Sequence, residues 1–492
     1  MLFNSLKFML FFLVVVLLYF IIPERMKKAW LLVSSYFFYM SWNIQYGALL
    51  AGVTLITYQG AIWIEKSGNI RVKKIYLILS VGAVLLILFF FKYFNFAINN
   101  LQAFLGMFGV AMPEKRFDVI LPVGISFFTF QGIGYEADVY KGEKAERNLW
   151  EYALFLSFFP QLVAGPIERS KNLLGQLHEK SQFNYERLRE GLLLMMWGYF
   201  LKLMIAGRAA IYVDTVYADF QLYPGIYSLI ATILFAFQIY CDFAGYSTIA
   251  MGAAKILGID LMDNFNCPYF SKSVAEFWNR WHISLGTWLR DYVYIPLGGN
   301  RKGIVRKYWN KIWVFLISGL WHGANWTFLA WGGVNAGYQI ISEVLKNGNR
   351  TFNIGSRIKS SFGYKAFQIG ITFLLIDFSW IFFRSESLNQ AFRMIRQMFM
   401  HFNAEMILQK DFFSCGLDPA EFTILLASIF VLLLADFCKY HHLVIRHWIL
   451  KQRCGFRWMA YLVIFYTIFI FGVWGEGYDA QSFIYLACFK IS

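Results

Sequence analysis

The chain has 492 residues, of which 58% are hydrophobic, 20% are aromatic and only 15% are charged. Soluble domains carry about 25% charged residues, so this composition indicates an integral membrane protein. The 45 Lys and Arg residues against 30 Asp and Glu give a formal net charge of +15. Basic loops and anionic lipid headgroups explain this excess better than nucleic acid does. We therefore expect membrane lipids, and not nucleic acid, as partners.

Apolar runs recur along the chain and predict helices that cross or enter the membrane. Several are shorter than the ~20 residues of an ordinary span, so we expect tilted or re-entrant helices. The sequence predicts an all-α polytopic bundle of about 11–14 helical segments, in a single transmembrane domain over residues 1–492. We expect the longest run to break into two helices near Gly332 and Gly333. The runs are Phe8–Ile22, Ala29–Trp42, Gly47–Ile64, Ile75–Phe91, Gly191–Ile205, Ile226–Phe243, Trp313–Ile341, Ala366–Phe383, Phe422–Phe437 and Trp458–Trp474.

Basic loops predict the topology. The clusters Arg25–Lys28 and Arg71–Lys74 follow the first and third runs, whereas the loop Asn43–Tyr46 between runs two and three is uncharged. The positive-inside rule then places both clusters in the cytoplasm and both termini outside, in a multi-pass protein of the inner (plasma) membrane. The basic loop Arg301–Lys307 is a further cytoplasmic candidate. The six cysteines, Cys488 among them, are scattered and form no metal or disulfide motif.

Two histidines, His282 and His322, lie 40 residues apart in apolar, tryptophan-rich sequence. A titratable group at membrane depth is costly and usually serves function, and imidazole suits proton transfer near neutral pH. The spacing of Trp278, Trp281 and His282, continued by leucines, predicts one face of a helix over Ala275–Leu297. An interfacial anchor is the alternative, since Trp and Arg both favour lipid headgroups.

The second histidine lies between two glycines. Gly319 and Gly323 would let a backbone or a ligand approach closely, and Trp326 is expected one helical turn on, on the same face as His322. A hydrogen-bonded histidine with a purely structural role is the alternative.

Other polar residues interrupt apolar sequence. Asp242 ends the run Ile226–Phe243, and Gln161 precedes a Pro/Gly-containing segment; each could line a cavity or make a helix–helix contact. No Gly-x-Ser-x-Gly elbow, zinc motif or Walker loop occurs, which argues against a serine hydrolase and a nucleotide-driven pump. We predict His322 and His282 as catalytic residues and no metal ligand. The predicted substrate-binding residues are Trp278, Arg280, Trp281, Asp291, Trp321, Asn325, Asp242 and Gln161.

Five segments together resemble the membrane-bound O-acyltransferase (MBOAT) family. The family's motif histidine falls on His322, and a second histidine common in prokaryotic members falls on His282. The segment Tyr292–Arg301 resembles the branch that O-acetylates bacterial polysaccharides such as alginate and peptidoglycan. The matching segments are Pro122–Gln131, Phe159–Ile167, Tyr240–Ser247, Glu276–Gly299 and Gly319–Gly332.

The resemblance implies a disc of tilted helices with funnels on both faces. It implies a cytoplasmic acyl donor, most simply acetyl-CoA, and an acceptor approached from outside. That acceptor is an extracytoplasmic polysaccharide, or a serine-hydrolase-like acetyltransferase of a polysaccharide export or synthesis complex.

In this hypothesis His322 is the general base, and His282 positions the donor, relays a proton or stabilises the oxyanion. Arg280 and the loop Arg301–Lys307 attract the phosphates of the donor. D-alanyl transfer to teichoic acid, and a transporter or flippase of a lipid-linked envelope precursor, are the alternatives.

Overall fold

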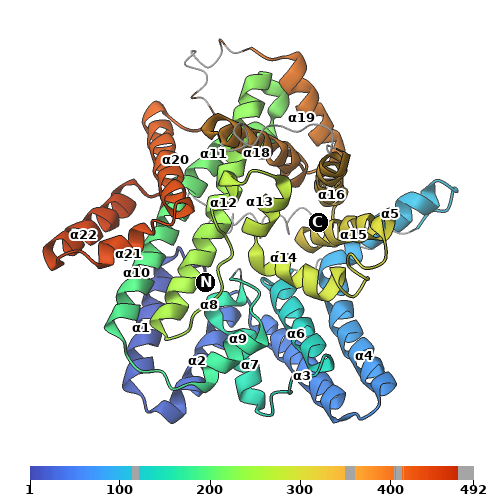
Figure 1. Cartoon of the computed structure of the whole chain (residues 1–492), viewed down its shortest axis with the longest axis vertical. Coiled ribbons are helices and arrows are strands. Elements are labelled where there is room, and N and C mark those ends of the chain that lie inside the picture. Colours follow the sequence, from blue (N-terminus) through green and yellow to red (C-terminus); the bar gives the residue numbers. More distant parts are fainter. Residues whose placement is uncertain are drawn as a thin grey trace. The chain divides into compact units, whose positions relative to one another are not determined.

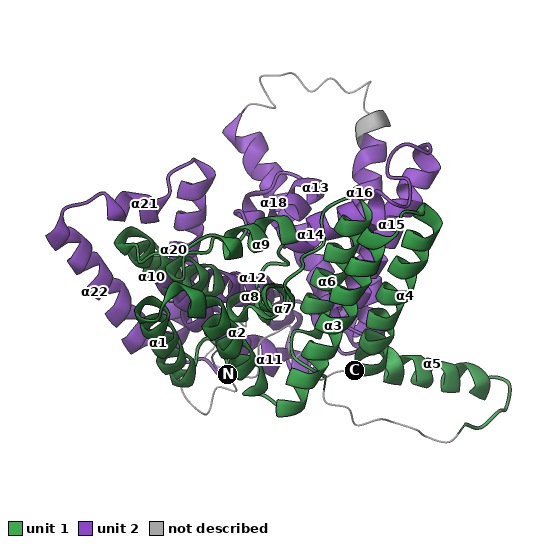
Figure 2. Ribbon diagram, turned by 90° about the horizontal axis from the view of Figure 1, so that it is seen from below, with its two compact units in different colours: residues 1–195, 249–262, 485–492 green, residues 196–248, 263–484 purple. Residues whose placement is uncertain are grey.

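The computed structural model describes residues 1–112, 121–163, 165–348, 361–403, 405, 413 and 415–474. Within these ranges every regular element is a helix, which confirms the predicted all-α fold. The chain divides into two compact units, coloured green and purple in Figure 2. Unit 1 contains Met1–Met195 and Ile249–Met262, and unit 2 contains Met196–Thr248 and the described residues from Asp263 onward. Cys488 and the C-terminus lie outside the described residues.

Unit 1 is built from the N-terminal helices, in which α3 packs against both α4 and α6; the three stand side by side in Figures 1 and 2. Asn43 and Asn69 begin α3 and α4, because their side chains accept hydrogen bonds from the backbone N–H two residues on. The elements are α1 (Leu6–Ile21), α2 (Glu24–Met40), α3 (Ile44–Lys66), α4 (Ile70–Leu88), the π-helical η1 (Phe89–Tyr93), α5 (Phe94–Gly106), α6 (Ile125–Tyr140), α7 (Leu149–Ser157), α8 (Phe159–Leu162), α9 (Ser170–His178) and most of α10 (Tyr185–Tyr199).

Unit 2 holds both histidines of interest. Its centre is formed by α15 and α16, which pack against each other, and by α18, which packs against α16 and α13. Its elements are η2 (Phe200–Ala206), α11 (Gly207–Ala218), η3 (Phe220–Leu222), the larger part of α12 (Gly225–Ile256), η4 (Pro268–Phe270), α13 (Val274–Arg280), α14 (Ile283–Leu289), η5 (Arg290–Tyr294), α15 (Ile304–His322), α16 (Trp326–Gly348), α18 (Phe362–Arg384), α19 (Leu388–Met400), α20 (Pro419–Tyr440), α21 (Ile445–Leu450) and α22 (Cys454–Phe471).

Seven helical stretches among the described residues are long and apolar enough to cross a membrane. This finding agrees with the multi-pass membrane protein that the composition predicts. Each of the ten predicted apolar runs is mainly helical. The seven stretches are Ile44–Lys66, Ile70–Gly106, Tyr185–Ala218, Gly225–Ile256, Phe362–Arg384, Pro419–Tyr440 and Cys454–Phe471.

The helix α12 is longer than the apolar run that predicted it. The run ends at Asp242, but the helix continues to Ile256. Lys202 of η2 forms an ion pair with Asp242, and both side chains are almost completely buried, with 4% and 3% exposed. A buried carboxylate is costly unless it is paired, so the lysine is what allows the helix to carry Asp242 in its interior.

The break in the longest apolar run is not where the glycine pair suggested. The chain leaves helical conformation at Gly323, between α15 and α16, whereas Gly332 lies inside α16. A Cβ on Gly332 would lie 2.5 Å from the carbonyl oxygen of Phe315 in α15. The prediction was wrong because this glycine permits close helix packing and does not end a helix.

The ion pair predicts a specific stability pattern. The variant Lys202→Met removes the ammonium group that pairs with the buried Asp242 carboxylate. We therefore expect the free energy of unfolding to fall by about 3–5 kcal/mol. The double variant Lys202→Met, Asp242→Leu removes both charges and should recover most of that loss. Unfolding in detergent, followed by intrinsic fluorescence, measures both values. Equal destabilisation of the single and double variants would contradict a charge-burial origin.

Candidate active site

His282 lies at the junction of two short helices, not within one long helix. α13 ends at Arg280, Trp281 is extended, and α14 begins at Ile283. The backbone of His282 is left-handed, with φ 45° and ψ 54°, which is uncommon for a residue other than glycine. The predicted continuous helical face over Ala275–Leu297 was therefore wrong, because the chain reverses its local direction at this histidine.

Asn264 holds this junction in place. Its backbone oxygen accepts from Ile283 N–H at 3.0 Å, and its side-chain oxygen accepts from Ser284 N–H at 3.2 Å. The same Oδ1 lies 3.3 Å from His282 Nδ1. A strained backbone conformation persists only where the surrounding structure fixes it. The three contacts of Asn264 hold the left-handed conformation of His282.

The contact also selects the tautomer of His282. Because Asn264 Oδ1 accepts from a backbone N–H, it is an acceptor, and His282 Nδ1 must be the donor. In the neutral imidazole Nε2 then carries the lone pair. His282 is only 2% exposed, and its burial lowers the pKa to about 3. The ring is consequently neutral across the physiological pH range.

His322 occupies the last position of α15, where that helix ends. The ring of Phe328 and its backbone lie where side chains on Gly323 and Gly319 would be, which confirms the predicted close approach of a backbone to Gly319. His322 is 4% exposed, whereas Trp326 is 54% exposed. The predicted common face of these two residues was wrong, because the helix ends between them.

The two helix breaks bring the imidazoles into one cluster of aromatic rings, called here the histidine pocket. The ring centroids of His282 and His322 are 6.5 Å apart, and the Trp321 ring lies 5.5 Å from the first and 5.0 Å from the second. Phe243 contacts His282 edge to face at 4.6 Å. His282 and His322, which are 40 positions apart in sequence, thus lie close together within unit 2.

A tryptophan cluster closes the pocket around His322. The rings of Trp331 and Phe383 lie 5.3 and 5.1 Å from it. Trp380 stacks on Trp331 at 5.9 Å and contacts Trp281 at 5.1 Å. All three tryptophans are at most 2% exposed, so the surroundings have low polarity and strengthen any electrostatic interaction inside.

Five of these neighbours are not among the predicted site residues. Phe243 and Trp331 lie in segments that carry the family resemblance, but no pattern marked them individually. Trp380 and Phe383 come from α18, beyond the segments that carry the family resemblance, and a tryptophan in an apolar run is no functional signal by itself. Asn264 stands in an irregular stretch before α13, and no sequence pattern marks it as the partner of a histidine.

The remaining predicted residues near this pocket are held by other groups. Trp278 donates to Asn335 Oδ1 at 3.2 Å, and its ring lies 5.4 Å from Trp331. Glu276 and Arg280 form an ion pair at 2.9 Å. Arg280 also donates to the Asn266 carbonyl and lies over the Tyr440 ring.

The other candidates have structural contacts of their own. Asp291 of η5 pairs with Arg290 at 2.8 Å, and Asp242 pairs with Lys202. Asn325 caps α16 by accepting from Thr327 N–H, and it donates to the Glu386 carbonyl. Gln161 belongs to unit 1, where it donates to Gln131 Oε1 and to the Phe155 carbonyl.

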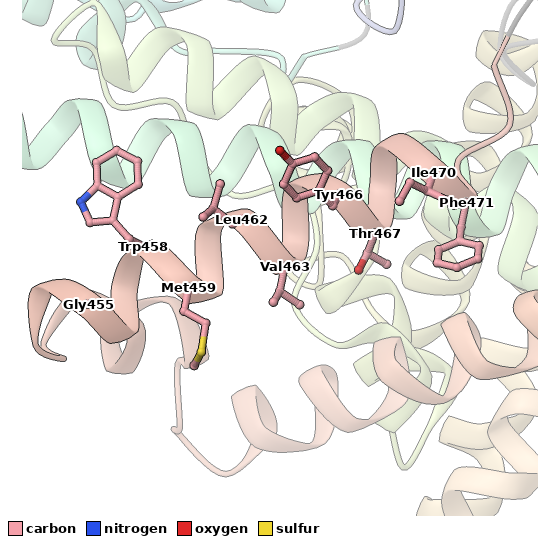
Figure 3. Close-up of a pocket in the computed structure, with 9 residues that line it drawn as sticks. All are labelled: Gly455, Trp458, Met459, Leu462, Val463, Tyr466, Thr467, Ile470 and Phe471. Atoms are coloured by element: carbon pink, nitrogen blue, oxygen red, sulfur yellow. The ribbon is translucent and has the colours of Figure 1, made fainter.

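An apolar groove runs along one face of α22 and contains neither histidine (Figure 3). Only Ile468 of this helix is buried. A membrane-crossing helix presents such a face to lipid acyl chains, so the groove is not a candidate for the reaction site. Its lining residues are Gly455, Trp458, Met459, Leu462, Val463, Tyr466, Thr467, Ile470 and Phe471.

Residues 136–383 match the model of the membrane-bound O-acyltransferase family, MBOAT. A probable alginate O-acetylase, AlgI, of Pseudomonas putida is 39% identical over 405 residues, which cover 81% of this chain and 80% of the relative. A peptidoglycan O-acetyltransferase of Helicobacter pylori is 34% identical over an alignment that covers 75% of this chain and 73% of the relative's length. A teichoic acid D-alanyltransferase of Streptococcus thermophilus is 27% identical over 53% of this chain and 68% of its own.

The fold defines an integral membrane protein that buries two histidines among aromatic rings in unit 2. The chain belongs to the membrane-bound O-acyltransferase family. It is accordingly an O-acyltransferase, as the sequence motifs predicted.

The neutral state of His282 predicts how stability depends on pH. Below pH 6.5 the unfolded chain binds a proton at this residue, whereas the folded chain does not until about pH 3, so stability falls as pH decreases through that window. In His282→Gln this part of the decrease should disappear. Unfolding temperatures between pH 7 and pH 4 test this, with the exposed His401→Gln as control. An unchanged pH profile in His282→Gln would contradict the buried neutral state.

Proposed function

We propose that this O-acyltransferase moves an acetyl group from cytoplasmic acetyl-CoA across the membrane. The acceptor is an extracytoplasmic polysaccharide or an acetyl-carrying partner protein. The observation that carries the proposal is the pair of buried imidazoles in one tryptophan-lined pocket. Acetyl transfer is favoured over D-alanyl transfer because the O-acetylating relatives match far more of the chain.

In this proposal His322 is the general base. Ester formation requires that a hydroxyl lose its proton as its oxygen attacks the thioester carbonyl; the proton passes to the imidazole and the thiolate leaves. Such base catalysis contributes roughly 10²–10⁴-fold. The buried position of His322, at a helix end lined by glycines and tryptophans, supports this role.

His282 fits one of its three predicted roles better than the others. Its Nδ1–H faces Asn264, so Nε2 of the neutral ring is an acceptor. An acceptor can take or relay a proton, but it cannot donate to an oxyanion. We therefore propose proton relay for His282, with Asn264 as a positioning residue.

We propose that the phosphates of the donor bind at the basic loop between η5 and α15. Arg301 and Lys302 are exposed there, and exposed cations attract polyanions over several ångströms. Arg280 is less suited to this role, because Glu276 already pairs with it. We propose that Trp278, Trp281 and Trp321 line the acyl pocket; substrate-binding roles for Asp291, Asn325, Asp242 and Gln161 stay predictions.

We further propose that the chain works as one domain in the inner (plasma) membrane. Both termini would be extracytoplasmic, with the clusters Arg25–Lys28 and Arg71–Lys74 in the cytoplasm. The partners would be a serine-hydrolase-like extracytoplasmic acetyltransferase and a polysaccharide export or synthesis complex.

Loss of the base should remove envelope ester. A deletion strain complemented with wild type should regain base-labile acetate in its envelope or secreted glycan. Complementation with His322→Ala, at matched membrane expression, should leave at least 100-fold less, from the magnitude of base catalysis. His401→Ala, which removes an exposed histidine, is the control and should behave as wild type.

Other outcomes of that assay are equally decisive. Full ester restoration by His322→Ala would contradict the base and return a transport function to consideration. Restoration of D-alanine in place of acetate would overturn the proposed acyl group but leave the chemistry standing.

Asn264→Ala should lower turnover without abolishing folding. Losing its hydrogen bonds to His282 and Ser284 should raise the activation free energy by about 1–3 kcal/mol, which lowers the rate roughly 5–150-fold. Acetyl transfer by the purified protein in liposomes measures kcat and KM separately. A fall in kcat at constant KM is expected for a positioning residue; a rise in KM alone would contradict that role.

A further inference from the structure

A histidine and two glutamates converge in unit 1, apart from the histidine pocket of unit 2. Glu146 lies in the loop after α6, Glu151 in the first turn of α7, and His178 is the last residue of α9. His178 Nε2 is 3.1 Å from Glu146 Oε2 and 2.7 Å from Glu151 Oε2. One ligand atom from each of the three residues lies within 4.8 Å of the other two.

The outer oxygens of both carboxylates are held by other groups. Glu146 Oε1 accepts from Asn148 N–H at 2.8 Å. Glu151 Oε1 accepts from Lys28 Nζ at 2.9 Å and from Asn148 Nδ2 at 3.3 Å. The inner Oε2 atoms are thereby directed at His178, and Glu151 Oε2 is itself shielded from solvent. Carboxylates that bind metals are oriented in this way by their second oxygens.

A single proton does not account well for this arrangement. Nε2 of a charged imidazole carries one N–H, which the two carboxylate oxygens would have to share. A divalent cation accepts lone pairs from all three atoms at once. Zn²⁺ binds His nitrogen and carboxylate oxygen at about 2.0–2.2 Å, which in a tetrahedral site places neighbouring ligand atoms about 3.3–3.6 Å apart. The observed distances of 3.1 and 2.7 Å are slightly shorter than this.

We propose that Glu146, Glu151 and His178 form a binding site for a divalent transition metal, with Zn²⁺ as the best fit to its one nitrogen and two oxygens. The His178 side chain is 49% exposed, so water completes the coordination. Two carboxylates balance the charge of the cation, and Lys28 remains outside the ligand set.

The bound metal would join the start of α7 and the loop before it to the end of α9, 27 residues further along the chain. α9 is a nine-residue helix that buries Leu173, Leu174 and Leu177 on one side. It directly follows the segment Phe159–Ile167, one of those that carry the family resemblance. Fixing the end of α9 to α7 would therefore stabilise that segment, and the metal would act as a structural clip.

Binding of Zn²⁺ alone to the full-length protein tests this. The protein, purified in detergent and treated with EDTA, is titrated with Zn²⁺ by calorimetry, and the retained metal is measured by elemental analysis. We expect one Zn²⁺ per chain and a rise in unfolding temperature that EDTA reverses. His178→Ala and Glu146→Gln should each weaken binding at least 10-fold.

Glu143→Gln is the matched control, because Glu143 stands in the same loop and pairs with Lys171 instead; it should bind Zn²⁺ as wild type does. Co²⁺ provides a second readout, since a visible absorption band of the bound ion should be lost in His178→Ala. No stoichiometric binding by wild type, or equal binding by wild type and His178→Ala, overturns the site. Folding of each variant is checked by its unfolding temperature in EDTA, and the isosteric Glu146→Gln keeps the test valid if His178→Ala does not fold.

Discussion

The burial of two imidazoles in an apolar helical bundle is the constraint on which the site depends. A continuous membrane helix satisfies its own backbone but leaves little freedom to aim a side chain, and helix ends expose backbone groups that need partners. His282 and His322 both lie at a break between two helices, and at each break an asparagine side chain accepts a backbone N–H. Asn264 accepts two backbone N–H groups beside His282, and Asn325 caps the helix that follows His322. The breaks are thus what allows the two rings to meet in one pocket.

Two titratable groups inside unit 2 are likewise either paired with an opposite charge or kept neutral. Unit 2 carries Asp242 inside a 32-residue helix only together with Lys202, and it keeps His282 neutral by enclosing it in aromatic rings. Trp281, Trp331 and Trp380 fill the volume around the histidines and exclude water. In the proposed mechanism this apolar shell keeps the His282 ring neutral, so that its Nε2 lone pair can accept a proton. The helix breaks and the aromatic rings would then serve the same step.

The sequence predicted the helical membrane fold and the family, because composition and short motifs carry that information locally. It did not predict the geometry that makes the pocket. Periodicity suggested one helix through His282, but the left-handed turn there depends on Asn264, a contact across 18 residues that no local pattern records. Gly332 resembled a helix break because a glycine that allows close packing and one that ends a helix look alike in sequence. Trp380 lies near the histidines because α18 packs against α16. Hydropathy alone cannot distinguish such a buried tryptophan from one that faces lipid.

The central claim is that the two histidines work as one unit, and a double-mutant cycle tests it most directly. The rate of acyl transfer would be measured in liposomes for His282→Gln, His322→Gln and the double variant, at equal amounts of folded protein. Residues that act in one step lose activity non-additively. The account predicts that the double variant is about as slow as the slower single variant. Losses that multiply, or a single variant with full activity, would show that the two imidazoles act independently and would contradict the account.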